Sequence, residues 1–194
     1  MHVVQLLDTQ IKMLLNLYRQ ESKERMDLDL IKKEIENWIF NYLDIPSAFY
    51  MDNKPCPFAA KAWRDSQVKV VMGKRATVRR EVYNWDDEYQ LVIVVYDPMI
   101  WKNPEPWAER YNNRLADNGK DLYVMVFEPG DEPPDDPELD PENYGQVVDY
   151  EYGMVLVQRR AELNKFSKFL ESQNYYSNCS TDFMQYVNKR RSQS

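Results

Sequence analysis

Residues 89–98, YQLVIVVYDP, hold the segment that decides how this chain folds. The run from Leu91 to Tyr96 is apolar at every position, with no alternation between apolar and polar residues. A half-buried strand alternates, whereas a short continuous apolar run is typical of a strand buried on both faces. We therefore expect a central strand here, in a sheet that is packed with helices.

Other segments predict the remaining strands. Further strands are indicated by apolar runs at 67–73, 121–130 and 152–158. A strand at 76–85 would form a hairpin with 67–73 around Gly73. Together these segments predict a mixed sheet of four or five strands.

Helical patterns separate and follow these strands. They occupy residues 103–119, 161–172 and 180–191. The first of these has prolines at its start and a glycine after its end, which is the usual punctuation of a helix. The acidic, proline-rich stretch 131–145 predicts a loop. Strands joined by helices, with one hairpin, give an α+β fold.

Two amphipathic stripes precede the sheet. Residues 3–20 and 28–43 each carry apolar side chains three and four positions apart, which predicts two helices and thus a helical hairpin. We expect this hairpin to occupy residues 1–45 and the α+β domain to occupy 46–194. The apolar stripes either pack on the chain's own domain or form the seam of a homodimer through residues 3–43.

Composition excludes several kinds of chemistry. The chain has 194 residues, a net charge of −7 and a single histidine, His2. A Ser-His-Asp triad therefore lacks its base, a zinc site built from histidines lacks its ligands, and nucleic acid is a disfavoured partner. The five glycines form no phosphate loop or dinucleotide fingerprint. Two cysteines and no long apolar run lead us to expect a cytoplasmic protein that does not bind membranes.

Cys56 lies between two prolines in the stretch PCPF, residues 55–58. If Pro57 occupies the first position of a helix, the helix dipole would stabilise a thiolate at Cys56. Cys56 is thus a candidate nucleophile or a soft metal ligand. The alternative is that Cys56 is a small buried residue that contributes only to packing.

Two carboxylates directly follow buried strands. Asp97 stands in VVYDP and Glu128 in VFEPG, each before a proline. If the two strands are adjacent, the carboxylates would converge as an acid–base pair or, with Cys56, as ligands of a divalent metal ion. Arg159 closes the last predicted strand, where its charge could meet these carboxylates or a substrate anion, or where it could simply be an exposed or salt-bridged strand end. The alternative is that both carboxylates cap the turns that follow them.

The order of these segments resembles an uncharacterised bacterial family, a domain of unknown function with a Leu-Cys-Pro-Phe-Ala motif after an opening helix. The matching stretch here is PCPFA, 55–59, and the resemblance extends over residues 30–172. In that family two buried strands end in His-Pro, and Asp97 and Glu128 stand in place of those histidines. The resemblance therefore implies a site at positions 56, 97 and 128 without naming a substrate.

Two functional hypotheses follow from these patterns. The first is a small enzyme that acts on a small-molecule substrate. Its catalytic residues would be Cys56, Asp97, Glu128 and Arg159. The second is a non-catalytic protein-binding or assembly module that uses the N-terminal helical hairpin, with Cys56 contributing only to packing.

Overall fold

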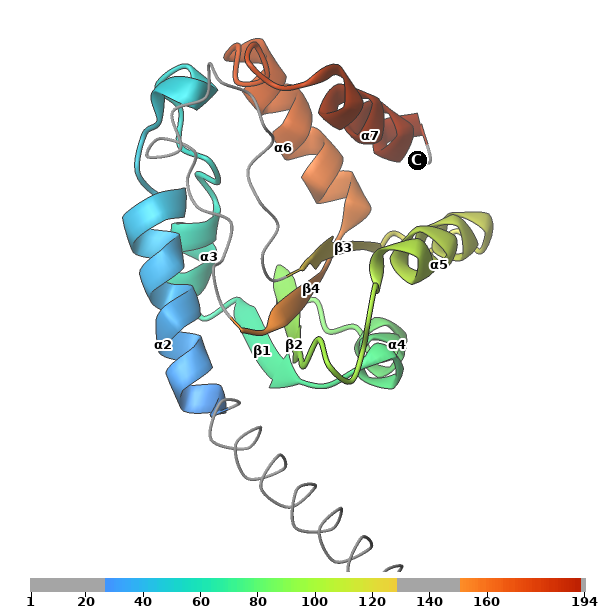
Figure 1. Cartoon of the computed structure of the whole chain (residues 1–194). Coiled ribbons are helices and arrows are strands. Elements are labelled where there is room, and N and C mark those ends of the chain that lie inside the picture. Colours follow the sequence, from blue (N-terminus) through green and yellow to red (C-terminus); the bar gives the residue numbers. More distant parts are fainter. Residues whose placement is uncertain (1–26, 129–150, 193–194) are drawn as a thin grey trace, which may run out of the picture.

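The structure is a computed structural model that describes residues 27–128 and 151–192. Within these ranges it contains six α-helices and one four-stranded mixed sheet, which confirms the expected α+β class (Figure 1). The helix expected at 3–20 and the loop expected at 131–145 lie outside the described residues.

The sheet has the strand order β1-β2-β4-β3. Its strands are β1 (Val68–Met72), β2 (Leu91–Tyr96), β3 (Tyr123–Phe127) and β4 (Gly153–Gln158). Strand β1 runs parallel to β2, and β4 lies antiparallel between β2 and β3. Strands β1, β2 and β3 therefore all end on one side, which we call the carboxyl end of the sheet. Strand β4 ends on the opposite side, the amino end.

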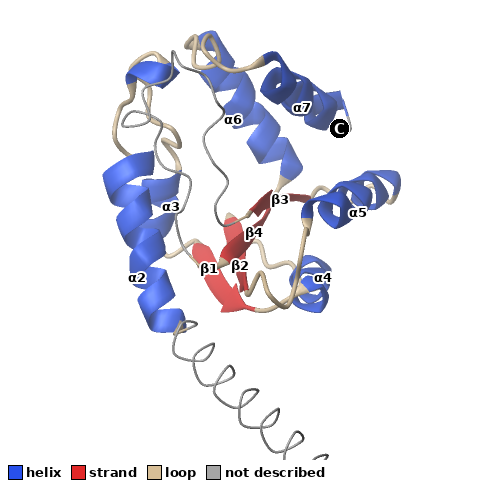
Figure 2. Ribbon diagram, in the orientation of Figure 1, coloured by secondary structure: helices blue, strands red, loops and turns tan. Residues whose placement is uncertain are grey.

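Helices cover both faces of this sheet, as the apolar run in β2 requires. They are α2 (Leu28–Trp38), α3 (Ala59–Arg64), α4 (Arg75–Tyr83), α5 (Glu105–Asp117), α6 (Arg160–Ser172) and α7 (Thr181–Ser192). Figure 2 shows α2 and α3 on one side of the sheet and α4 and α5 on the other. Two short turns follow α2, a π-helical turn (Ile39–Leu43) and a 3₁₀ turn (Ala48–Tyr50).

The apolar stripe of α2 packs on the chain's own sheet. Ile31, Ile35 and Trp38 are buried in one core cluster with residues of β1, β2 and β4. The strand residues of this cluster include Val70 and Ile93, which alternate with neighbours that face α4 and α5. The helix predicted at 28–43 is therefore present, and its stripe is buried within the chain.

The strand predicted at 76–85 is wrong, because this segment forms α4. Strands β1 and β2 are parallel, so they cannot be joined as a hairpin and need a crossover, which α4 provides. Val78 and Val82 lie four positions apart, and both are buried against the sheet. Threonine and valine have high strand propensity, which is why the sequence pattern of this segment predicts a strand.

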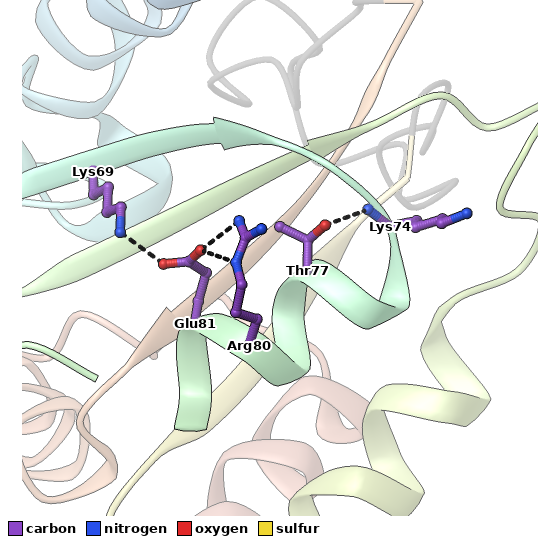
Figure 3. Close-up of polar contacts among 5 residues, drawn as sticks. All are labelled: Lys69, Lys74, Thr77, Arg80 and Glu81. Atoms are coloured by element: carbon purple, nitrogen blue, oxygen red, sulfur yellow. Dashed lines mark hydrogen bonds and ion pairs between the residues drawn. The ribbon is translucent and has the colours of Figure 1, made fainter. Parts of the chain in front are cut away.

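Polar contacts fix α4 to β1, as Figure 3 shows. The Glu81 carboxylate is buried, and it accepts hydrogen bonds from Lys69 Nζ at 2.8 Å and from Arg80 Nη2 at 2.9 Å. Burial acts to raise the pKa of Glu81, but these bonds and charges outweigh burial and lower the pKa below its usual value. At the other end of α4, Thr77 Oγ1 accepts the Lys74 N–H at 3.3 Å.

The outer edge of β3 is sealed by one side chain of α5. Asn112 is buried, its amide donates to the carbonyl of Val124, and its oxygen accepts the Val124 N–H, both at 2.8 Å. An edge strand exposes main-chain groups that would otherwise pair with another chain. Asn112 satisfies one such pair of groups from within the fold.

Candidate functional site

Cys56 lies where the chain docks on the end of α6. Its N–H donates to the carbonyl of Leu43 at 3.1 Å, and Tyr175 Oη donates to the carbonyl of Pro55 at 2.7 Å. Helix α3 begins at Ala59 with Phe58 as its capping residue. The expectation that Pro57 is the first helical residue is therefore wrong, since the helix begins two positions later.

The surroundings of Cys56 favour the neutral thiol. Burial raises the pKa of Cys56, and hydrogen bonds from the N–H groups of Ala59 and Phe58 reduce that rise without cancelling it. Burial likewise raises the pKa of Cys179 to about 11. A nucleophilic cysteine needs the opposite shift, so this environment is that of a packed cysteine.

Asp97 and Glu128 both lie at the carboxyl end of the sheet, directly after β2 and β3. The two strands are not neighbours, because β4 runs between them. Two inter-strand spacings separate them by about 10 Å. The Asp97 carboxylate accepts the N–H of Met99 at 2.8 Å, as expected for a side chain that shapes the turn after it.

Arg159 lies at the opposite end of the sheet from these carboxylates. Strand β4 is antiparallel to β2, and its last residue, Gln158, pairs with Leu91 at the start of β2. The Arg159 guanidinium forms ion pairs with Asp87 and, at 3.7 Å, with Asp121. The expectation that Arg159 meets Asp97 and Glu128 is therefore wrong.

No metal centre assembles in the part of the chain that the structure describes. Within residues 27–128 and 151–192, no three His, Cys, Asp or Glu side chains gather so that they could hold a metal ion. The expected ligand set of Cys56, Asp97 and Glu128 is therefore not brought together.

The turn between β2 and α5 presents two apolar side chains to solvent. In this segment, the side chains of Met99 and Ile100 are 62% and 68% exposed. The N–H groups of Ile100 and Trp101 both donate to the carbonyl of Asp97 at 3.0 Å. Together with the hydrogen bond from the Met99 N–H to the Asp97 carboxylate, these bonds define the path of the turn.

Aromatic packing also stabilises this turn through Trp101. The Trp101 ring lies 5.2 Å from the ring of Tyr96 and 5.2 Å from that of Trp107. The Tyr96 ring in turn lies over Gly153, where a Cβ atom would approach it to 2.1 Å. Glycine at this position of β4 therefore makes room for Tyr96, and Tyr96 supports Trp101. The turn that exposes Met99 and Ile100 is thus fixed by the packing of Trp101 and Tyr96.

Exposed cations follow β1 and the turn after β2. Met72, the last residue of β1, is 38% exposed and pairs with Val95 of β2. Lys74, Arg75 and Lys102 are exposed close by in sequence, and the described residues offer them no ion pair. We call this set the carboxyl-end surface; it consists of Met72, Lys74, Arg75, Met99, Ile100 and Lys102.

The sequence analysis did not predict the carboxyl-end surface. It assigned chemistry to Asp97, whereas the structure gives Asp97 a role in shaping the turn. The signal was present in the sequence: MIW follows the turn-forming pair Asp97–Pro98, and apolar residues in a turn need a reason.

In the described ranges, no helix has both the length and the apolar character needed to cross a membrane. Comparison with known proteins finds no match for this chain among family models, curated proteins or solved structures. The resemblance to the bacterial Cys-Pro-Phe-Ala family thus stays a prediction.

Proposed function

We propose that this chain is a non-catalytic protein-binding module that docks through its carboxyl-end surface. The observation that carries the proposal is the ordered turn that holds Met99 and Ile100 in solvent. Full burial of a methionine or isoleucine side chain contributes about 1.5–3 kcal/mol each. Because hydrogen bonds and Trp101 already order the turn, little conformational entropy is lost when a partner covers it.

The charges of this surface indicate the chemistry of the partner. The chain as a whole carries a net charge of −7, yet Lys74, Arg75 and Lys102 give the carboxyl-end surface three exposed positive charges. A second copy of the same surface would bring like charges together. The complementary partner is a different protein with an acidic segment that carries exposed apolar side chains.

The proposed interface differs from the one expected at the N-terminal helical hairpin. The stripe of α2 is buried against the sheet, so it cannot also form an intermolecular seam. The stripe of residues 3–20 lies outside the described residues. The enzyme hypothesis has less support, because the pKa of Cys56 is raised and Arg159 lies far from Asp97.

Site-specific photo-crosslinking tests the proposal. A benzophenone amino acid replaces Ile100 in one variant and Tyr83 in the control variant. Tyr83 is the most exposed large apolar residue of the described part and ends α4. We expect a discrete adduct in cells of the source organism from position 100 and none from position 83.

The crosslinked protein is then purified and its affinity for this chain is measured. We expect Ile100→Asp to weaken binding by about 10- to 100-fold, and binding of the wild type to weaken as salt rises. Tyr83→Ser should leave the affinity unchanged. Equal adducts from both positions, or an affinity that Ile100→Asp does not alter, would refute the docking surface.

A further inference from the structure

Helix α7 packs in the angle between α5 and α6, next to the start of β3 (Figure 1). Its contacts reach both helices, with Lys189 paired to Glu109 of α5 and Arg190 Nε donating to Asn164 Oδ1 of α6 at 3.1 Å. Val187 of α7 is 1% exposed. The junction of α6 and α7, which we call the α6–α7 seam, is therefore a buried contact between helices.

A buried guanidinium in this seam has no carboxylate partner within residues 27–128 and 151–192. Arg190 is 5% exposed, and none of the described carboxylates forms an ion pair with it. Its neighbours are the amide of Asn164 and the ring of Tyr123, whose centroid is 6.0 Å from the guanidinium carbon. Burial lowers the pKa of Arg190, with Tyr186 and Tyr176 close enough to act against that shift.

Helix α6 carries a second buried guanidinium, that of Arg160. Arg160 is 7% exposed and precedes Asn164 by four residues on the buried face of α6. Its Nη2 donates to the carbonyl of Lys120 at 3.3 Å. Its Nη1 is buried without a hydrogen-bond partner among the described residues. Arg160 thus lies one turn before Asn164 along α6, and Arg190 contacts Asn164 from α7.

In the described part of the chain, counter-charge for the seam is sparse. Arg191 brings a third guanidinium, which pairs with the half-exposed Glu171 at 2.9 Å and donates to Ser167 Oγ at 2.8 Å. Buried charges in proteins are normally paired, because removing an ion from water is costly unless a counter-ion accompanies it. Guanidinium groups match the oxygens of phosphate-type anions with two parallel hydrogen bonds.

We propose that the α6–α7 seam is a binding site for a small oxyanion of the phosphate class, held between Arg160 and Arg190. The anion supplies the counter-charge that the described residues do not give Arg190, and it accepts the hydrogen bond that Arg160 Nη1 can donate. The seam is separate from the carboxyl-end surface, since Arg160 follows the end of β4 at the amino end of the sheet.

Calorimetric titration with inorganic phosphate at constant ionic strength tests the site. The probe is compared with sodium chloride, and binding is followed in parallel by ³¹P line broadening. We expect the wild type to bind phosphate and to melt at a higher temperature in phosphate than in chloride. Arg190→Met should weaken phosphate binding by about 10- to 100-fold, since it removes a charge-assisted pair.

The matched control is Arg110→Met on the exposed face of α5, which should bind phosphate like the wild type. Without phosphate, Arg190→Met should melt no lower than the wild type, because it removes a buried charge that no described carboxylate compensates. If Arg190→Met fails to fold, the wild-type titration and Arg160→Met still decide the question. Equal effects of phosphate and chloride on the wild type would overturn the proposal.

A phosphate monoester such as glycerol phosphate distinguishes the source of the anion. Tighter binding than that of inorganic phosphate supports a site for the phosphate end of a metabolite. Weaker binding supports a seam that closes around the free ion.

Discussion

Replacement of Asn112 by alanine tests how this fold protects the edge of its sheet. The Asn112 side-chain amide forms two hydrogen bonds with the main chain of Val124, one to its carbonyl and one from its N–H. Both residues are buried. Alanine removes both hydrogen bonds and leaves two buried main-chain groups unsatisfied. Each such group costs about 1–3 kcal/mol, so we expect a loss of about 2–6 kcal/mol in the free energy of unfolding. For a chain of this size that corresponds to a fall in Tm of about 4–24 °C.

Urea denaturation followed by circular dichroism measures this loss. The midpoint should fall while the m-value stays constant, since the same surface is exposed on unfolding. Arg110→Ala, an exposed change on the same helix, is the control and should alter the free energy of unfolding by less than about 0.5 kcal/mol. Asn112→Asp keeps the acceptor for the Val124 N–H but sets a carboxylate oxygen against the Val124 carbonyl. We expect it to be at least as destabilising as alanine at neutral pH.

A small effect would refute this reasoning. If Asn112→Ala costs less than about 0.5 kcal/mol, water satisfies the edge of β3, and α5 does not seal it. Native-state hydrogen exchange gives an independent measurement. The Val124 amide should exchange faster in Asn112→Ala than in the wild type, while amides in the interior of β2 should change only with global stability.

Two further predictions concern ionisable groups. The pKa of Glu81 is lowered from 4.5 in the folded state, so its contribution to stability is present above that pH and is lost as the pH falls through the folded pKa. Glu81→Gln should therefore be less stable than the wild type at pH 7 and approach it in acid, as measured by urea titrations from pH 2 to 7; a pH-independent difference would contradict the assignment. With a pKa of about 11, Cys179 should react with iodoacetamide at pH 8 about two hundredfold more slowly than a free thiol of pKa 8.5. Cys56 should also react slowly in the folded protein, and rapid native-state alkylation of Cys56 that persists below pH 7 would restore the nucleophile hypothesis.

Several elements could be predicted from the sequence because their signals are local. The apolar run Leu91–Tyr96 indicates a strand buried on both faces wherever it is placed. The prolines before α5 and Gly119 after it mark where a helix can begin and end. The positions of Asp97 and Glu128 at the ends of two strands follow from the same local patterns.

The misassigned segments are those whose local signals suit two structures. Residues 76–85 contain valine and threonine, which favour strands, yet Val78 and Val82 also lie on one face of a helix. The parallel pairing of β1 and β2 decides between the two, and this pairing joins residues more than twenty positions apart. Asn112 carries no local sign of its role, since its partner Val124 is reached only after the chain reverses.

The candidate site divides in the same way between sequence and structure. The sequence by itself determined which residues end strands, which stretches turn and where the charges lie, because these depend on neighbours within a few positions. Only the tertiary structure decided that β4 separates Asp97 from Glu128, that Arg159 lies at the other end of the sheet, and that arginines of α6 and α7 are buried. Strand order, strand direction and helix docking arise from contacts between distant segments, and the residues on one segment do not specify which other segment will cover them.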